Sequence, residues 1–483
     1  MILKTIIQQI DSLNIDGDTH RRIENITHDS RYATNNDIFV AIRGEKVDGR
    51  RFAPTLQVAA VIADAPVDVA TGVTTIMVPD ARKALAQAAA ALYNQPSKEM
   101  FVVGLTGTNG KSTTAGILEH IFQHNHVPVG IIGTIGHRLF GTDIANQDGR
   151  TTPEASTLQK LLRNWKDQGC KVVVMEASSI GLAWNRVDGI RFSAACFTNF
   201  SRDHLDFHDS MESYLAAKRR LFTELVDQHS VCIFNAEDLA CAETATVGKK
   251  WLFSPSKKTT DLYVQNVSQD LSGIRCEVHT PYGSYHMKSP LIGNHNIDNM
   301  LCAIGVALSY GLSLSQIAAS IQTLPPVPGR LERVGASVPI FVDYAHTPDA
   351  LEHVLKTLRA LCTGRLLTIF GCGGDRDRGK RPIMGKIAEI HSDICIVTSD
   401  NPRSEDPQSI INDILAGMTD THRNFVSREE GIAFAISQAQ PNDVILIAGK
   451  GHETYQEING VKNPFDDRIV ASKYANQEGN HAV

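Results

Sequence analysis

The feature of this sequence that most constrains its fold is a glycine-rich loop between a short apolar run and a helical pattern. The loop reads Gly104-Leu-Thr-Gly-Thr-Asn-Gly-Lys-Ser112, follows the apolar residues 101–103 and precedes a helical pattern that extends through Ile121. In such a strand, loop and helix, backbone amides point at phosphate oxygens, Lys111 supplies a positive charge and Ser112 offers a hydroxyl to Mg²⁺. The common pattern places its first glycine at position 105, where this chain has Leu105, so the loop is a variant. The sequence therefore predicts a nucleotide site in an α/β protein.

Length and composition favour a soluble enzyme of several domains. The chain has 483 residues, which predicts about three domains, and it is 42% hydrophobic and 21% charged. It contains no apolar run near the ~20 residues that a membrane span needs, and its first ten residues lack a secretory pattern. The nine cysteines form no C-x-x-C pair, and the net charge of −6 argues against nucleic acid as the main partner. We expect a cytoplasmic protein without disulfides or a zinc site.

Short β-branched runs repeatedly lead into helical patterns, which is typical of α/β proteins. The expected strands are 101–105, 171–176 and 194–198 in the middle of the chain, and 340–344, 366–370, 394–398 and 444–448 near its end. Two breaks, at 94–97 and at the proline-rich 325–329, predict domains at 1–96, 97–328 and 329–483. Ligands bind beyond the carboxyl ends of parallel strands, so the loops after these strands are the expected sites.

Two further loops carry candidate metal ligands. Glu176 stands at the end of the expected strand 171–176, where a second metal ligand near a phosphate loop is expected. The run 198–206 adds acids and His204 after the next strand. Each signal is weak alone, and their combination favours a metal-assisted nucleotide enzyme.

With these loops in view, the chain resembles the Mur ligases, the ATP-dependent amide-forming family that builds the peptide stem of bacterial peptidoglycan. The matching motifs are Thr106 to Ser112, Met175 to Ser179, Asn199 to Asp206, Gly293 to Ile297, Pro328 to Glu332 and Asp343 to His346. It is most similar to the branch that adds the third residue of the stem, through His28 to Arg31, Thr151 to Pro153, Tyr214 to Lys218, Gly371 to Arg376 and Gly449 to Glu453. The resemblance implies a small N-terminal α/β uridine-nucleotide domain, a central P-loop ATPase domain with a mostly parallel sheet, and a C-terminal Rossmann-like domain.

The resemblance also implies which residues hold ATP and magnesium. The implied ATP-binding residues are Gly107, Thr108, Asn109, Gly110, Lys111, Ser112, Thr113, Asn296 and Arg330, with Asp343 and His346 completing the site. Ser112, Glu176, His204 and Lys218 would serve Mg²⁺, with Lys218 carrying a carbamate derived from CO₂. Without the family, Lys218 beside Arg219 and Arg220 indicates only a solvated basic face.

The nucleotide substrate implied by the resemblance is UDP-N-acetylmuramoyl-L-Ala-D-Glu. Its implied contacts are Ser30, Glu45, Lys46, Val47, Arg150, Thr151, Thr152, Ser178, Trp184 and Arg186. The family commonly has Asn where this chain has Arg150 and Gln where it has Trp184. Extra positive charge at Arg150 suits a dianionic substrate.

The incoming amino acid is the third implied substrate. The run Asp400-Asn401-Pro402-Arg403 is similar to the signature of family members that add meso-2,6-diaminopimelate, and Arg376, Gly449 and Glu453 would complete the pocket. The fork of Arg403 suits the distal carboxylate, while Asp400 and Glu453 suit the ammonium. Lysine lacks that carboxylate and would leave Arg403 unpaired.

The implied reaction passes through an acyl phosphate. Lys111, Arg330 and Mg²⁺ would stabilise the developing charge, Lys218 would support the metal, and either His346 or Asp343 would accept the amine proton. We expect a monomer with small-molecule partners only. The alternatives are the same reaction with L-lysine, a folylpolyglutamate-type ligase, and a nucleotide-driven binding module without ligase chemistry.

Overall fold

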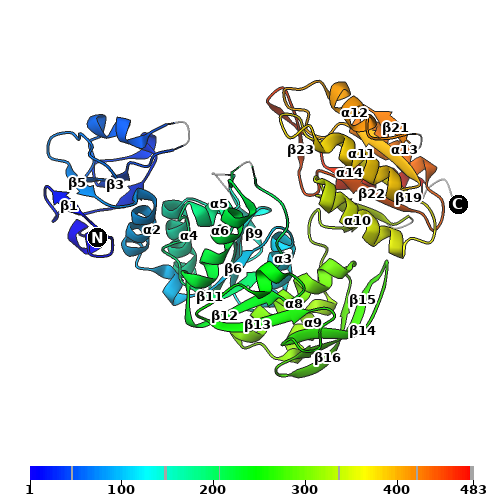
Figure 1. The fold of residues 1–483 in the computed structure, drawn as a ribbon, viewed down its shortest axis with the longest axis horizontal. Helices are drawn as coiled ribbons and strands as arrows, with labels where there is room; N and C mark the ends of the chain where they lie inside the picture. Colours follow the sequence, from blue (N-terminus) through cyan, green and yellow to red (C-terminus); the bar gives the residue numbers. More distant parts are fainter. Residues whose placement is uncertain (45–46, 146–148, 206, 336–337, 420–421, 479–483) are drawn as a thin grey trace. The chain divides into compact units, whose positions relative to one another are not determined.

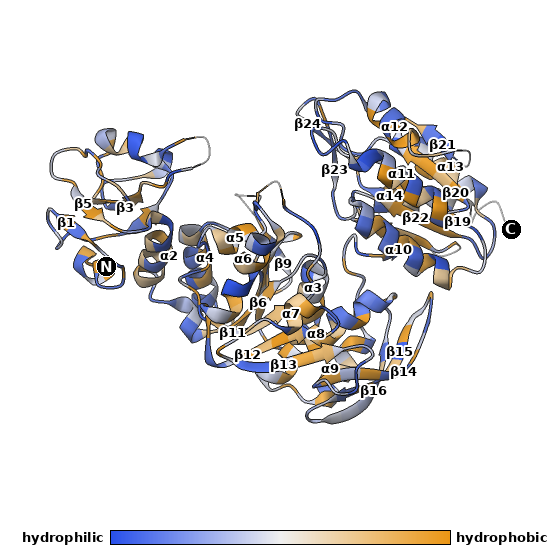
Figure 2. Ribbon diagram, in the orientation of Figure 1, coloured by the Kyte–Doolittle hydropathy of each residue, from blue (hydrophilic) through white to orange (hydrophobic). Residues whose placement is uncertain are grey.

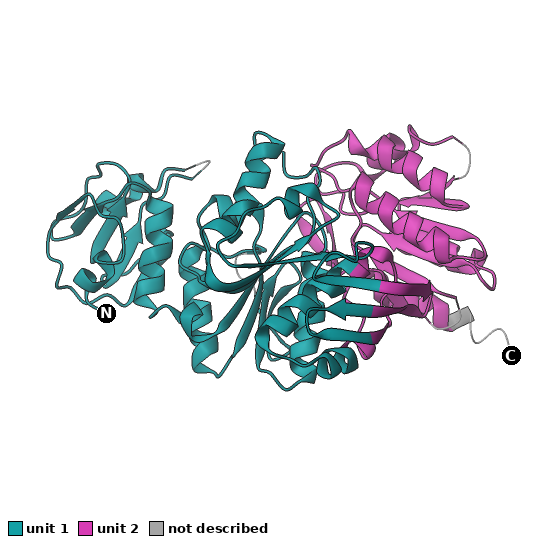
Figure 3. Cartoon of the chain, turned by 60° about the horizontal axis from the view of Figure 1, so that its bottom comes forward, with its two compact units in different colours: residues 1–264, 278–285, 298–320 teal, residues 265–277, 286–297, 321–483 magenta. Residues whose placement is uncertain are grey.

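The structure is a computed structural model that describes residues 1–44, 47–145, 149–205, 207–335, 338–419 and 422–478. It contains two compact units (Figure 3). Unit 1 comprises residues 1–264, 278–285 and 298–320, and unit 2 comprises 265–277, 286–297 and 321–483. No helix within the described ranges is both long and apolar enough to span a bilayer.

The first sheet belongs to the N-terminal part of unit 1 (Figure 1). Its order is β1-β5-β4-β3-β2, with bounds Asn14–Asp16, Thr74–Met77, Ala60–Ala63, Asp37–Val40 and Asn25–Thr27. Helices α1 (Leu3–Ile7) and α2 (Ala81–Leu92) accompany it, with the short 3₁₀ helices Ser30–Tyr32, Gly49–Thr55 and Pro96–Glu99. Helix α2 begins where the Asp80 carboxylate accepts hydrogen bonds from the amides of Arg82 and Lys83, and its alanines form a buried face.

The second sheet contains the phosphate-loop strand at its centre. Its order is β16-β15-β14-β13-β12-β11-β6-β10-β7-β8-β9. The central strands are β6 (Phe101–Thr106), β10 (Val172–Glu176), β7 (Val129–Gly133), β11 (Phe192–Phe197), β12 (Val226–Asn235) and β13 (Lys249–Ser254), which pair in parallel. The outer strands, of which β16 and β9 form the two edges, are β8 (Gly136–Leu139), β9 (Thr142–Ile144), β14 (Leu262–Asp270), β15 (Gly273–Thr280) and β16 (Gly283–Ser289). The accompanying helices are α3 (Lys111–His124), α4 (Ala155–Asp167), α5 (Ser179–Ala183), α6 (Met211–Thr223), α7 (Leu239–Ala242), α8 (Asn294–Tyr310) and α9 (Leu314–Gln322).

The third sheet, in unit 2, is covered by helices on both faces. Its order is β17-β18-β22-β19-β20-β21, with bounds Glu332–Val334, Ile340–Asp343, Val444–Ala448, Leu366–Phe370, Ile394–Thr398 and His422–Phe425. Alternate strand residues form two apolar clusters, one with α10 (Pro348–Leu361), α11 (Lys380–His391) and α12 (Pro407–Leu415), the other with α13 (Arg428–Gln438) and α14 (Asp467–Glu478). The strands are therefore apolar throughout, as Figure 2 shows for β19, β20 and β22. A hairpin of β23 (Tyr455–Ile458) and β24 (Val461–Pro464) follows β22.

The predicted α/β class is confirmed, and each of the seven expected strands is present with ends shifted by at most a few residues. The three sheets occupy residues 14–77, 101–289 and 332–425 with 444–448. The domain boundaries at residues 96 and 328 stay a prediction.

Candidate active site

The phosphate loop joins β6 to α3 in a conformation that only glycine adopts easily. Gly107 has φ +145° and Gly110 has φ +85°. A Cβ on Gly107 would lie 1.9 Å from the Thr198 hydroxyl oxygen, and one on Gly110 would lie 2.3 Å from Asn299 Oδ1. Lys111 Nζ folds back onto the loop and donates to the carbonyls of Gly107 (2.8 Å) and Thr108 (2.9 Å). The loop is thus tightly held, and the Lys111 ammonium lies against its own backbone carbonyls.

The loop after β11 braces this turn. The Thr108 amide donates to the Asn199 carbonyl (3.0 Å), and the Asn109 amide donates to Asn199 Oδ1 (2.8 Å). The Thr198 hydroxyl donates to the Asn109 carbonyl at 2.6 Å. Thr113 is buried in the first turn of α3. Neighbouring parallel strands therefore fix the loop that sequence alone identified.

Glu176 stands at the end of β10 and is only 1% exposed. Its carboxylate accepts from the Ser112 hydroxyl (2.8 Å), the Thr134 amide (3.0 Å) and the Thr134 hydroxyl (3.0 Å). The structure thus brings together two of the predicted magnesium ligands, Ser112 and Glu176. Sequence reasoning missed Thr134, which follows β7 and carries no motif of its own.

Lys218 on α6 is 1% exposed, which excludes the solvated basic face that its sequence neighbours indicate. Its Nζ donates to the Gly107 carbonyl (2.8 Å), the same oxygen that accepts from Lys111, and lies 4.5 Å from the centre of the Tyr214 ring. Burial, and next the charge of Lys111, hold the pKa of Lys218 well below its usual value. Two amines therefore converge on one carbonyl oxygen.

His204 contacts the same Tyr214 ring that Lys218 approaches. Its ring centre is 6.0 Å from that of Tyr214, and its Nε2 is 3.6 Å from Asp203 Oδ2. Within the described residues, no three His, Cys, Asp or Glu side chains form a group that could hold a metal ion. The predicted magnesium set is not such a group, because it depends on a hydroxyl and on a modified lysine.

The predicted muramoyl residues after residue 149 form one cluster. The Thr152 hydroxyl donates to the Glu176 carbonyl (2.8 Å) and lies 3.0 Å from the Ser178 hydroxyl. The Thr151 hydroxyl lies 3.0 Å from that of Thr134. Ser178 caps α5 by accepting from the Gly181 amide. These hydroxyls thus lie directly beside the Glu176 carboxylate.

Three charged side chains border these hydroxyls. Arg150 Nη1 (2.7 Å) and Arg186 Nη2 (2.9 Å) share one oxygen of Glu154. Arg186 also donates to the Thr152 carbonyl (3.1 Å), and its guanidinium carbon is 4.9 Å from the centre of the Trp184 ring. Glu154 is the N-cap residue of α4 and was not predicted from the sequence.

The predicted uridine contacts lie earlier in the chain. Ser30 begins the 3₁₀ helix Ser30–Tyr32, and Val47 is exposed. Glu45 and Lys46 lie outside the described residues.

The remaining predicted nucleotide residues belong to unit 2. Asn296 is 3% exposed and donates to the Ile292 carbonyl, and the Arg330 guanidinium carbon lies 5.0 Å from the centre of the Tyr344 ring. Asp343 accepts from the amides of Leu331 (2.7 Å) and Ala345 (2.8 Å), and burial raises its pKa. His346 is exposed, with Nδ1 2.8 Å from the Tyr344 carbonyl oxygen.

Three strand-end loops of the third sheet come together, as the sequence predicted. Arg403 has φ +53° and donates from Nη1 to the Gly374 carbonyl (2.7 Å). A Cβ on Gly373 would lie 2.9 Å from Arg403 Nη1 and 3.8 Å from Arg376 Cγ. A Cβ on Gly449 would lie 2.6 Å from Asp400 Oδ2. The loops after β19, β20 and β22 therefore lie against one another.

Among these loops the four residues 400–403 have different surroundings. Asp400 is 7% exposed, and within the described residues its Oδ2 is buried without a hydrogen-bond partner. Asn401 and Pro402 are buried, and Asn401 donates to Glu453 Oε2 (2.7 Å). Glu453 Oε2 also accepts from the fully buried Lys450 (3.2 Å). Glu453 is thus held by two protein donors, whereas Asp400 Oδ2 has no donor among the described residues.

Buried arginines support these loops and were not predicted. Arg381 is fully buried and pairs with Glu405 (2.9 Å), which accepts from the Asp375 amide. Arg428, also buried, pairs with Asp467 (2.7 Å) and donates to the Ala448 carbonyl at the end of β22. A guanidinium can join several carbonyls and carboxylates at once, which suits it to fixing loop backbones.

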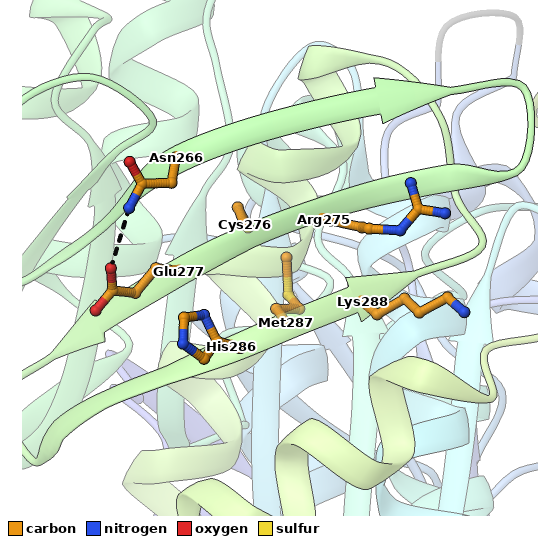
Figure 4. A pocket seen from close by; sticks show the side chains of 7 residues that line it. All are labelled: Asn266, Arg275, Cys276, Glu277, His286, Met287 and Lys288. Carbon is orange, nitrogen blue, oxygen red and sulfur yellow. Dashed lines mark hydrogen bonds between the residues drawn. The ribbon is translucent and has the colours of Figure 1, made fainter.

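The surface of unit 2 also contains a hollow of about 270 Å³ on β14, β15 and β16 (Figure 4). It is lined by Asn266, Arg275, Cys276, Glu277, His286, Met287 and Lys288. Asn266 donates to Glu277 across it (3.3 Å). None of the predicted site residues belongs to this lining, so the hollow is separate from the chemistry above.

Comparisons with known proteins match nearly the whole chain. The chain matches the family descriptions "Mur ligase family, catalytic domain" over residues 22–93, "Mur ligase middle domain" over 105–307 and "Mur ligase, glutamate ligase domain" over 329–451. It is 42% identical over 501 residues to a UDP-N-acetylmuramoyl-L-alanyl-D-glutamate--2,6-diaminopimelate ligase of Geobacter metallireducens, covering 97% of each chain. A protein of the same description from Geobacillus thermodenitrificans is 37% identical over 98% of each chain.

Solved structures give the same relationship. A structure described by the same ligase name superimposes with a TM-score of 0.74 at 32% identity, covering 99% of both chains. A folylpolyglutamate synthase of Mycobacterium tuberculosis superimposes with a TM-score of 0.62 at 18% identity and covers 75% of this chain. The second likeness concerns the fold alone.

Proposed function

Because the chain belongs to the Mur ligase family, we propose that it uses ATP to join meso-2,6-diaminopimelate to UDP-N-acetylmuramoyl-L-Ala-D-Glu. The product is a cytoplasmic precursor of peptidoglycan, and the protein works as a monomer. The relatives named above carry this activity in their descriptions and match nearly the whole chain.

The observation that carries the amino-acid assignment is that the strand-end loops of unit 2 bring together two arginines and a buried carboxylate. Arg403 and Arg376 flank Gly373, and the Asp400 carboxylate has a buried oxygen without a partner within the described residues. The distal end of diaminopimelate carries one carboxylate and one ammonium, which matches these two kinds of group. Lysine offers the ammonium alone and would leave a guanidinium desolvated and unpaired.

In the first step, a carboxylate of the dipeptide attacks the γ-phosphorus of ATP, and ADP leaves with the electrons of the broken P–O bond. Two anions must approach each other, so positive charge at the phosphate loop lowers the barrier. Lys111 supplies that charge at the start of α3, and Arg330 is the second cation that we assign to this role. Gly107 and Gly110 let backbone amides face the phosphates.

In the second step, the neutral amine of the amino acid attacks the acyl carbon, and inorganic phosphate leaves. The amine proton needs an acceptor, and His346 suits this role better than Asp343. The Tyr344 carbonyl can only accept, so His346 Nδ1 carries the hydrogen and Nε2 is the basic nitrogen. Asp343 already accepts two backbone amides, so it holds the Leu331 and Ala345 backbone in place.

Mg²⁺ would be held by Ser112, Glu176, His204 and a carbamylated Lys218, and when bound it supplies charge neutralisation for the phosphates. The residues fit this group. The Glu176 carboxylate accepts from Ser112 and Thr134 and could exchange these donors for a hard cation.

Lys218 likewise fits a carbamate. Burial and Lys111 favour its uncharged amine, which is the form that adds to the carbon of CO₂ and then releases a proton. The product is an anion beside Lys111, in place of a second cation on the Gly107 carbonyl.

The test is phosphate release from ATP with UDP-N-acetylmuramoyl-L-Ala-D-Glu, comparing meso-diaminopimelate with L-lysine. We expect release that depends on both the nucleotide and diaminopimelate, with lysine a poor substrate. Equal rates with lysine would instead support the lysine-adding alternative. Release that requires a folate in place of the nucleotide would support the folylpolyglutamate-type alternative, and no amino-acid-dependent release would reject ligase activity.

A further inference from the structure

Arg82 lies at the start of α2, in the N-terminal part of unit 1, and contacts the muramoyl cluster of the central part. Its guanidinium carbon is 4.5 Å from the centre of the Trp184 ring. Helix α2 packs against α4, whose N-cap residue is Glu154, and Figure 1 shows α2, α4 and α5 in succession. Arg82 therefore connects the segment predicted to hold uridine with the segment predicted to hold the peptide.

Trp184 contacts two guanidinium groups. Arg186 lies 4.9 Å from the ring centre, close to the 4.5 Å of Arg82. A cation near an indole face is attracted by the ring's quadrupole, and the attraction is larger where water is excluded. Trp184 thus links Arg82 to Arg186 without a direct bond between the two cations.

The surroundings of Arg186 favour the binding of a further anion. Arg186 is 5% exposed, shares Glu154 with Arg150, and its Nε is buried without a hydrogen-bond partner in the described ranges. Burial lowers the pKa of Arg186. The Glu154 carboxylate raises this pKa, whereas the charges of Arg150 and Arg82 lower it further. An additional anion would satisfy Nε and offset the like charge.

The substrate of the proposed reaction offers such an anion. Its glutamate has two carboxylates, of which one must lose its charge to become the acyl phosphate. The other stays ionised throughout, so a permanent guanidinium partner stabilises it without opposing the chemistry.

We propose that Arg82 is a positioning residue for the nucleotide dipeptide substrate: acting through Trp184, it orients Arg186 toward the non-reacting carboxylate. This inference rests on the proposed function. It assigns to α2 a part in binding the peptide end of the substrate. That binding then depends on the Trp184 ring, which contacts both Arg82 and Arg186.

The experiment compares Arg82→Gln with Lys83→Gln, the adjacent residue on the same helix. Lys83 is exposed and its ion pair, with Asp11, is 3.4 Å long, so it controls for the loss of a positive charge on α2. For Arg82→Gln we expect roughly a tenfold rise in the KM for UDP-N-acetylmuramoyl-L-Ala-D-Glu, with the KM values for ATP and diaminopimelate unchanged. Arg82→Lys should restore most of the affinity, because an ammonium also binds an indole face.

A merely structural role would change all three KM values together or lower the thermal unfolding midpoint, and either result would overturn the inference. So would a KM for the nucleotide equal to that of Lys83→Gln. Trp184→Phe should reproduce part of the loss, and combining it with Arg82→Gln should add little, because both changes remove the same contact. Full additivity of the two changes would also count against the mechanism.

Calorimetry of nucleotide dipeptide binding distinguishes a failure of this inference from a failure of the proposed function. If the wild-type protein binds it but releases no phosphate, the proposed function fails and the comparison of variants still stands. If turnover is normal and Arg82→Gln binds as tightly as the wild type, the inference fails alone. If the wild type does not bind the nucleotide dipeptide, both are rejected.

Discussion

Replacing Arg403 by alanine tests the proposed amino-acid site most directly. The Arg403 side chain is 24% exposed, and its Nη1 is held by the Gly374 carbonyl at 2.7 Å. Within the described residues its Nη2 has no hydrogen-bond partner, and its Nε lies 3.5 Å from Glu457, beyond a good hydrogen bond. The guanidinium therefore has donors left for a substrate carboxylate. Both residues carry a Cβ, so the left-handed backbone at φ +53° costs alanine about as much as arginine.

The expected loss follows from those donors. A hydrogen bond to a charged group contributes about 1.5–3 kcal/mol, and the partly exposed site reduces the sum of two to about 2–4 kcal/mol. That range corresponds to a fall in kcat/KM for diaminopimelate of about 30- to 1,000-fold, since each 1.36 kcal/mol is a factor of ten. The KM for ATP should stay unchanged, and Arg423→Ala, which removes an exposed arginine on β21, should leave kcat/KM intact.

The assay is phosphate release at saturating ATP and nucleotide, with diaminopimelate varied. A kcat/KM for Arg403→Ala within about threefold of the wild type would refute the assignment of this side chain to the distal carboxylate. An equal loss with lysine would refute it too, because lysine has no carboxylate at that end.

Three further predictions concern Lys218, the phosphate loop and the buried carboxylate of Asp298 on α8. Lys218→Ala should lower activity at least about a hundredfold, as loss of a group at the phosphates does, and short carboxylic acids should restore part of it by replacing the carbamate; full activity without them would rule the carbamate out. Gly107→Ala should abolish measurable ATP binding by calorimetry, because its Cβ would lie 1.9 Å from the Thr198 hydroxyl, whereas Gly72→Ala, at φ +82° with nothing within 4 Å, should bind ATP normally. Burial raises the pKa of Asp298 to about 7. The folded chain therefore retains a proton that the unfolded chain releases near pH 4. The contribution of Asp298 to the free energy of unfolding thus falls as pH rises from about 4 to 7. Asp298→Asn should therefore raise the apparent unfolding midpoint more at pH 8 than at pH 5, and equal increments at both would contradict the raised pKa.

Sequence reasoning was most successful where local pattern and chemistry coincide. The strands at 366–370, 394–398 and 444–448 are buried on both faces, so they appear as continuous apolar runs bounded by polar loops. The phosphate loop is equally local, because its glycines, Lys111 and Ser112 are consecutive in the chain. The outer strands β14, β15 and β16 were not predicted, since they are partly exposed and their residues are largely polar.

Lys218 shows how a local pattern misleads. Beside Arg219 and Arg220 it indicates a solvated face, yet α6 turns it inward with Tyr214, while Arg220 pairs outward with Glu224. Consecutive helix residues point about 100° apart, so three adjacent cations need not share an environment. Only the motif shared with the family identified the lysine.

The sequence by itself determined the α/β class, the phosphate loop and the set of strand-end loops in which the chemistry is predicted, because each depends on residues that are neighbours in the chain. The tertiary structure alone decided which of these loops meet. Thr134 reaches Glu176 across 42 residues, Arg82 reaches Trp184, and Asp400 loses solvent beside Gly449. These contacts depend on strand order and helix packing, which bring distant residues together and set the burial that shifts their pKa values.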